Sequence, residues 1–122
     1  MSERIKPDLV LPLKLIWFAK IWNGEKKVEY REVKPYWTRR IGKWVCDNTP
    51  KFILFKIGYT KDGLRLLVQT SGVDIGSCPY TGWNGDYYRI RFEIVQPYFF
   101  ADGIFYPLFE MPKMKEKNGG TK

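Results

Sequence analysis

Histidine is absent from this sequence, and cysteine occurs only twice among its 122 residues. Without histidine the chain cannot build a Ser-His-Asp or Cys-His triad, nor any metal site that uses imidazole ligands. Cys46 and Cys78 lie too far apart in the sequence for a Cys-x-x-Cys motif, and two cysteines alone cannot form a structural zinc site. Any chemistry must therefore use lysine, carboxylate or hydroxyl groups, and we expect no metal and no other cofactor.

Long apolar runs are also absent. No stretch of about 18 consecutive apolar residues occurs, so the sequence predicts no transmembrane helix. The first residues, Met1 to Arg4, mix charges and lack the apolar segment of a signal peptide. These features favour a cytoplasmic protein with no membrane partner, whose cysteines are free thiols in a reducing compartment.

Positive charge is abundant and unevenly distributed, with a formal net charge of +8. Residues 26–56 hold nine basic and three acidic side chains, whereas residues 57–112 hold four basic and six acidic ones. A concentrated positive surface attracts phosphates, so this distribution favours a polyanionic partner. The alternative, that the charge only keeps the protein soluble, stays open.

The order of patterns along the chain predicts an α+β fold. Residues 14–23 have the apolar spacing of an amphipathic helix, with Leu15, Phe18 and Trp22 on the buried face. About five to six strands with one or two short helices favour a curved sheet that closes into a small barrel. Strands are expected at 9–13, 27–33, 51–57, 64–70 and 87–94, a helical turn at 35–41, and a long glycine-rich loop at 71–86.

The chain length suits one domain with one core. We expect an N-terminal arm over residues 1–8, a single domain over 9–112, and a charged, disordered tail over 113–122. The aromatic-rich segment 97–112 is expected to pack across the barrel. We also expect a monomer.

The turn after the predicted helix begins the candidate site. Gly24 ends the helix, and Lys26, Glu29 and Arg31 follow it; Glu29 and Arg31 share one strand face because strand side chains alternate. If that face lines a cleft, Arg31 can hold a phosphate or a base edge, and Glu29 can accept from an amine or act as a base. Lys26 can bind an oxyanion. The alternative is an ion pair on a solvated strand face.

This segment resembles the hallmark Gly-x-Lys-x-x-x-x-Arg of the ASCH domain family in the PUA-like superfamily, which often has Glu two residues before the Arg. The matching positions here are Gly24, Lys26, Glu29 and Arg31. The preceding helix and the following segment up to Trp37 are similar to a bacterial and phage branch of that family. The resemblance covers roughly residues 9–95.

The resemblance implies a PUA-like β-barrel with a cleft beside the helix, in a superfamily whose members bind RNA or modified bases. Some ASCH proteins are small hydrolases of acylated cytidine or of RNA, and the amidohydrolases have Lys at position 26 and Thr at position 29. Because Glu29 replaces that Thr, the same hydrolysis is in doubt. Only Asp74, Asp86 and Glu93 are candidates, by elimination, for the later catalytic Glu of that group.

Aromatic and basic residues extend the candidate site. Stacking of a base on an aromatic ring contributes about 1–3 kcal/mol, so exposed rings beside cations favour nucleic-acid binding. Trp17, Trp22 and Phe55 are expected in the core instead. The expected ligand-binding residues are Lys26, Glu29, Arg31, Lys34, Tyr36, Trp37, Arg39, Arg40 and Tyr59.

The sequence therefore predicts an RNA- or nucleotide-binding module with a basic cleft beside the motif. One alternative is a metal-independent hydrolase of nucleosides or RNA that uses Lys26, Glu29 and Arg31 as catalytic residues. A second alternative is a phage-type protein-interaction factor.

Overall fold

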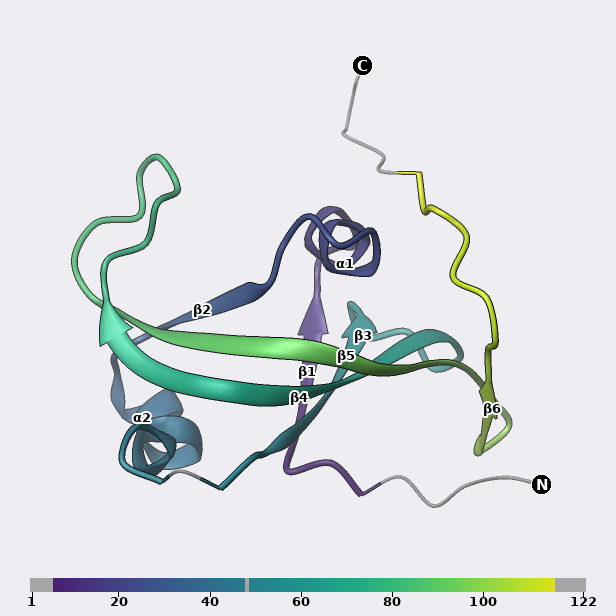
Figure 1. The fold of residues 1–122 in the computed structure, drawn as a ribbon, viewed down its shortest axis with the longest axis horizontal. Coiled ribbons are helices and arrows are strands. Elements are labelled where there is room, and N and C mark those ends of the chain that lie inside the picture. The colour runs from purple at the N-terminus through teal and green to yellow at the C-terminus, as the bar shows by residue number, and fades with distance from the viewer. Residues whose placement is uncertain (1–5, 48, 116–122) are drawn as a thin grey trace.

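The computed structural model describes residues 6–47 and 49–115. Within them the chain forms an α+β fold with one mixed, six-stranded sheet and two short α-helices (Figure 1), so the α+β part of the predicted fold class is confirmed. In chain order, the elements are β1 (Leu9–Leu13), α1 (Leu15–Trp22), β2 (Val28–Glu32), α2 (Pro35–Ile41), a 3-10 turn η1 (Gly42–Val45), β3 (Phe52–Ile57), β4 (Gly63–Gly76), β5 (Tyr87–Ala101) and β6 (Ile104–Pro107).

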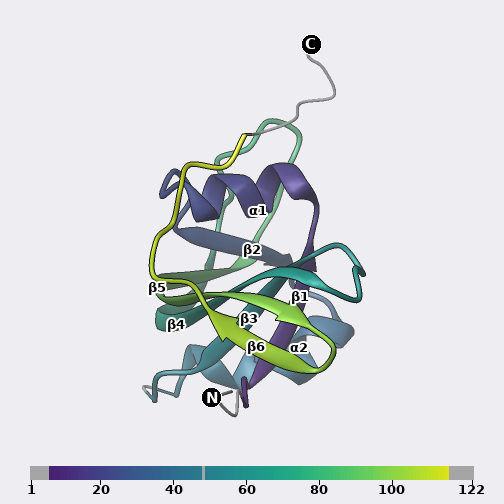
Figure 2. The same cartoon turned by 90° about the vertical axis from the view of Figure 1, so that its right-hand side faces the viewer.

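The strands are ordered β1-β3-β4-β5-β2, with β6 paired to the far end of β5. Only β1 and β3 run parallel; the other neighbours are antiparallel. The long β4–β5 ribbon is strongly curved, with α1 above it and α2 below it in both ribbon views (Figures 1 and 2). β1 and β2 form the two edges of this order, and no strand pairing joins them in the described part of the chain. The sheet is therefore curved but open, and the predicted closure into a barrel is not confirmed.

Alternation along β5 defines the two faces of the sheet. Tyr88, Ile90 and Phe92 are buried, and they define the inner face, which carries the hydrophobic core. Ile94 continues the same alternation but is 39% exposed, because it borders a cavity. The side chains between these residues point to the outer face.

The predicted apolar stripe of α1 is only partly correct. Phe18 and Trp22 are buried in the core as expected, but Leu15 is 36% exposed. Ile21, which the stripe left out, is 1% exposed. Leu15 begins the helix, so the sheet covers only the later turns, and Phe18, Ile21 and Trp22 at i, i+3 and i+4 form the buried face.

The predicted loop at 71–86 is wrong for its first part. Residues 71–76 belong to β4, which resumes pairing with β5 after a register shift between Thr70 and Gly72. Glycine at position 76 gives room to a neighbour, because a Cβ there would lie 2.5 Å from Cζ of Arg89. The glycine content of this segment predicted a loop, but its pairing with β5 makes it a strand.

Residues 108–115 form a C-terminal strap, which runs from β6 past β5 to the end of α1 (Figure 2). Trp22 Nε1 donates to the carbonyl of Pro112 at 2.8 Å, and Asn23 exchanges two hydrogen bonds with the backbone of Met114. The packed chain therefore extends past the predicted boundary at 112. The rest of the predicted tail, residues 116–122, lies outside the described residues, as does most of the predicted N-terminal arm.

None of the helices in the described ranges has the length and apolar character needed to cross a membrane.

Candidate functional site

The structure brings Lys26, Glu29 and Arg31 into one cluster, here called the inner triad, in which Lys26 and Glu29 are buried and the Arg31 side chain is 20% exposed. Lys26 Nζ donates to Glu29 Oε1 at 2.7 Å, and Arg31 Nη2 donates to Glu29 Oε2 at 2.6 Å. Lys26 Nζ also donates to the carbonyl of Val28. Lys26 and Glu29 are only 7% and 6% exposed. One carboxylate thus compensates a buried lysine and a partly buried arginine, in a place where an unpaired charge would be costly.

Strand alternation explains why these charges are inside. Glu29 pairs with Ile90 and Arg31 pairs with Tyr88, and directly paired residues share a face of the sheet. Since Ile90 and Tyr88 are on the inner face, the two charged side chains are as well. The cluster is therefore not the ion pair on a solvated strand face that the sequence left open.

Aromatic rings surround Lys26. Its Nζ lies 5.9 Å from the ring centroid of Trp17 and 5.5 Å from that of Tyr30. The ring of Tyr80 lies 5.1 Å from Trp17 and 5.5 Å from Tyr30, so the segment that joins β4 to β5 reaches across β2. Trp17, which was expected in the core, is partly buried and packs against the core from this side.

The rings of Trp17, Tyr30 and Tyr80 form an aromatic wall around Lys26, and its two phenol groups are held in their neutral form. Burial is the main cause that raises the pKa of Tyr80 to about 12, and nearby acidic groups add to the rise. Burial likewise raises the pKa of Tyr30. Both hydroxyls therefore keep their protons at neutral pH, and the wall adds no negative charge.

Arg31 is positioned by two contacts. Glu29 holds Nη2, and the guanidinium lies 4.9 Å from the ring centroid of Trp37 in α2. α2 is fixed to β5 by a 2.7 Å hydrogen bond between the hydroxyls of Thr38 and Tyr88. Arg31 Nε is buried and has no hydrogen-bond partner among the described residues. The guanidinium is thus held in one orientation, and part of its hydrogen-bonding capacity is not satisfied by the described residues.

A cavity of about 290 Å³ lies beside Arg31 and is called here the aromatic cavity. Four of its seven lining residues are aromatic. Among them, Trp83 packs on Tyr87 with ring centroids 5.5 Å apart. The sequence alone assigned no role to Trp83, Tyr30, Tyr80 or Tyr87, although the aromatic residues between Tyr80 and Tyr88 were an available signal. The lining residues are Tyr30, Arg31, Glu32, Trp37, Gly82, Trp83 and Tyr87.

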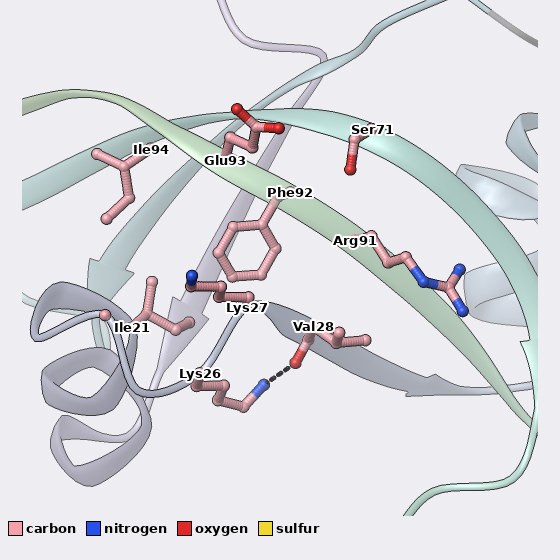
Figure 3. A pocket seen from close by; sticks show the side chains of 10 residues that line it. Ile21, Lys26, Lys27, Val28, Ser71, Arg91, Phe92, Glu93 and Ile94 are labelled. Carbon is pink, nitrogen blue, oxygen red and sulfur yellow. Dashed lines mark hydrogen bonds between the residues drawn. The ribbon is translucent and has the colours of Figure 1, made fainter.

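A larger cavity of about 510 Å³ lies between α1, the start of β2 and β5. Figure 3 shows Lys26 reaching the carbonyl of Val28 at its lower rim, with Phe92 pointing down from β5 toward Lys27. Arg91 points away from Phe92, and its Nη1 lies 3.2 Å from Asp74. Four of its ten lining residues are aliphatic or aromatic, three are cations, and two of those cations already have carboxylate partners.

The exposed cations predicted for the site surround Trp37. Lys34 and Arg40 stand three residues before and after Trp37, and both are exposed, as is Arg39. The Arg40 guanidinium lies 3.5 Å from the ring centroid of Tyr36, while Lys34 Nζ lies 2.8 Å from a carboxylate oxygen of Glu32. This edge of the molecule is therefore positive and accessible.

Tyr59 is the predicted site residue that the structure does not bring to this place. It is 89% exposed in the turn between β3 and β4. The amide of the adjacent Gly58 donates to the carbonyl of Leu13, which puts this turn beside the end of β1. Tyr59 follows the end of β3, whereas α2, which carries Trp37, precedes its start. Figure 1 shows α2 at the start of β3, away from the β3–β4 turn.

A second cluster of one carboxylate and two arginines lies on the outer face. Arg89 Nε donates to Asp74 Oδ1 at 2.8 Å, and Arg91 Nη1 donates to Asp74 Oδ2 at 3.2 Å. The hydrogen bond from Arg89 is the main cause that lowers the pKa of Asp74. Three carboxylates were considered for catalysis. Asp74 is held by Arg89 and Arg91 on the outer face, Asp86 is exposed, and Glu93 lines the larger cavity.

Within residues 6–47 and 49–115, no group of three or more cysteine, aspartate or glutamate side chains is arranged to hold a metal ion. Cys46 is exposed and Cys78 is buried, and both are free thiols.

Comparisons with known proteins return no match: no family model, no curated protein and no solved structure is significantly similar to this chain.

Proposed function

We propose that this protein is an RNA- or nucleotide-binding module that holds one base in the aromatic cavity. The observation that carries the proposal is Arg31, which Glu29 and Trp37 orient at the wall of that cavity. An oriented guanidinium loses little conformational entropy when it binds, and it can contact a base edge or a phosphate through two donors. The surrounding rings supply stacking surfaces that accept a planar base.

Two cations of α2 and the lysine just before it would hold the neighbouring phosphates. Lys34, Arg39 and Arg40 are exposed next to Trp37, so a strand whose base enters the cavity would pass its backbone over them. Each phosphate contact releases counterions, which makes the affinity depend on salt. The net charge of +8 supports the same type of partner.

The proposal includes a relationship to the ASCH family of PUA-like proteins, with the open, curved sheet as an incompletely closed form of their barrel, and a monomer in the cytoplasm. It is supported by the motif spacing of Gly24, Lys26, Glu29 and Arg31 and by the convergence of the three charged residues. The curved sheet with α1 beside β2 agrees with such an architecture.

A hydrolase that uses Lys26 is the weaker alternative. Lys26 donates to two oxygen acceptors and is buried under aromatic rings, an arrangement that suits a cation holding the cluster together rather than a nucleophile. We predict no turnover of acylated cytidines or short RNAs. Product that forms with the wild type and disappears in a folded Lys26→Met variant would put the enzyme first.

A protein-interaction role has one specific feature in its favour. Phe99 and Tyr106 are paired across β5 and β6, and they are 43% and 49% exposed. An exposed apolar surface of this kind often marks a protein contact. Competition between RNA and a captured protein partner would separate this role from RNA binding.

The proposal is tested by measuring the affinity of short single-stranded RNAs and mononucleotides for the wild type and for Arg31→Ala. Removing a charge-assisted hydrogen bond should weaken binding by about 1.5–3 kcal/mol. Arg91→Ala removes an equal charge from the outer face and is the matched control, which should bind almost as well as the wild type. Equal weakening in both variants would contradict the proposal.

The role of α2 is tested through salt. Replacing Lys34, Arg39 and Arg40 by Ala should reduce the slope of log affinity against log salt by about 0.7 for each single-strand phosphate that the variant no longer neutralises. The same measurement on a Lys61→Ala variant, whose charge lies in the distant β3–β4 turn, should give the wild-type slope. An unchanged slope in the triple variant would exclude α2 from the binding surface.

A further inference from the structure

The aromatic cavity carries two opposite charges at its wall, and from their placement we propose that it selects guanine over the other bases. This inference rests on the proposed function, because it specifies which base the same cavity takes. Arg31 and Glu32 both line the cavity, although consecutive strand residues normally point to opposite faces. They can do so because β2 is an edge strand of the sheet, so a cavity at its end touches both faces.

Arg31 supplies the donors. In the described part of the chain, its only hydrogen bond is the one from Nη2 to Glu29, which leaves Nη1 without a partner. The contact with Trp37 fixes the plane of the guanidinium. A planar donor group held in this way suits two adjacent acceptors, such as O6 and N7 of guanine.

Glu32 supplies the acceptors. Its side chain is 63% exposed and makes an ion pair with Lys34, whose side chain is 52% exposed. Such an exposed pair contributes little to stability, so a ligand can replace it. Lys34 would then be free to move to a phosphate. The Glu32 carboxylate suits two adjacent donors, such as N1–H and N2–H of guanine.

Guanine matches this pair of charged groups better than any other base. It has two adjacent donors on one edge and two adjacent acceptors on another. Adenine offers its only amino group between acceptors, and cytosine and uracil each have a single donor group on the pairing edge. A carboxylate facing any of these three would be left partly unpaired, and unpaired polar groups in a site reduce affinity strongly.

The size of the cavity limits the ligand to one base. A volume of about 290 Å³ lies at the lower end of the range for small-molecule sites. The rings of Trp37 and Trp83 provide apolar surface for a purine, which has more area to stack than a pyrimidine.

The test measures the affinity of GMP, AMP, CMP and UMP by the change in tryptophan fluorescence, together with two analogues of GMP. IMP lacks the 2-amino donor that would face Glu32, and 7-deaza-GMP lacks the N7 acceptor that would face Arg31. We expect GMP to bind at least about tenfold more tightly than AMP, CMP and UMP. IMP and 7-deaza-GMP should each lose a large part of that advantage.

Two variants assign the selectivity to its side chain. Glu32→Ala should bind GMP and IMP equally, because the group that distinguishes them is gone. Glu110→Ala removes an exposed carboxylate from the C-terminal strap and should keep the difference. A persistent preference for GMP over IMP in Glu32→Ala would overturn the role of Glu32.

A second arm compares a seven-nucleotide uridine RNA with the same RNA carrying one central guanosine. Selection of guanine in either arm supports the inference, and the arm that shows it tells whether a free nucleotide or RNA is bound. Binding without base preference in both arms would overturn this inference and leave the proposed function intact. Absence of binding in both arms would overturn both.

Discussion

The molecule contains the same charge arrangement twice, once on each face of the sheet. In the inner triad, Glu29 lies between Lys26 and Arg31; on the outer face, Asp74 lies between Arg89 and Arg91. The two carboxylates differ in their surroundings, because the side chain of Glu29 is 8% exposed and that of Asp74 is 42% exposed.

The two clusters are near neighbours in the sheet. Arg89 pairs with Tyr30 and Ile90 pairs with Glu29, so one step along β5 separates the outer cluster from the inner one. Similar charges at similar distances therefore meet different dielectric environments. In the interior a charge depends on its partner, whereas at the surface water can replace the partner. The comparison shows that the face of the sheet on which a charged side chain lies, and not the charge pattern itself, decides how much the ion pairs contribute to stability.

The largest expected effect is the loss of stability on removing the inner carboxylate. Glu29→Gln leaves the buried Lys26 and the partly buried Arg31 without a compensating carboxylate and should lower the free energy of unfolding by about 3–5 kcal/mol. Asp74→Asn is the matched change on the outer face and should cost less than about 1 kcal/mol. Urea denaturation of both variants measures the difference, and equal losses would break the comparison.

A pair of double-mutant cycles sharpens the same contrast. Combining Lys26→Met with Glu29→Gln should show a coupling energy toward about 3 kcal/mol, since these two groups are in contact and buried. Combining Arg91→Ala with Asp74→Asn should show a coupling below about 1 kcal/mol. Repeating both cycles in high salt should reduce only the outer coupling, because buried pairs are screened much less.

The smallest expected effect is the pH dependence of the outer cluster. The arginines lower the pKa of Asp74 in the folded protein, so its contribution is present above the ordinary aspartate pKa of about 3.9. It is lost as the pH falls through the lower folded value. The stability difference between the wild type and Asp74→Asn should thus be present at neutral pH and vanish in strong acid. A difference that grew toward low pH would contradict this sign.

Local patterns in the sequence predicted most elements of the fold. The helix near 14–23 and the strands near 27–33, 51–57 and 87–94 occur where periodicity placed them, because side-chain spacing is a property of the chain itself. The exceptions depend on long-range contacts. Residues 71–76 form a strand because β5 pairs with them, and no local signal in that glycine-rich segment indicates a partner.

The candidate site was predicted in part. The spacing of Glu29 and Arg31 placed both on one strand face, and that is what the pairing with β5 shows. Tyr59 was grouped with Tyr36 and Trp37 because it is aromatic and near basic residues in the sequence. The path of β3 carries it to the other end of the strand, and sequence distance gives no information on that separation.

By itself, the sequence determined that Glu29 and Arg31 would share one side of their strand, with Lys26 in the glycine turn just before it. Only the tertiary structure decided that this side is the interior. Burial depends on which strand pairs with β2 and on which elements cover the paired face, and both are set by residues far away, such as Ile90 in β5 and Trp37 in α2. The physical reason is that hydrophobic burial and charge compensation act through space, whereas periodicity acts along the chain.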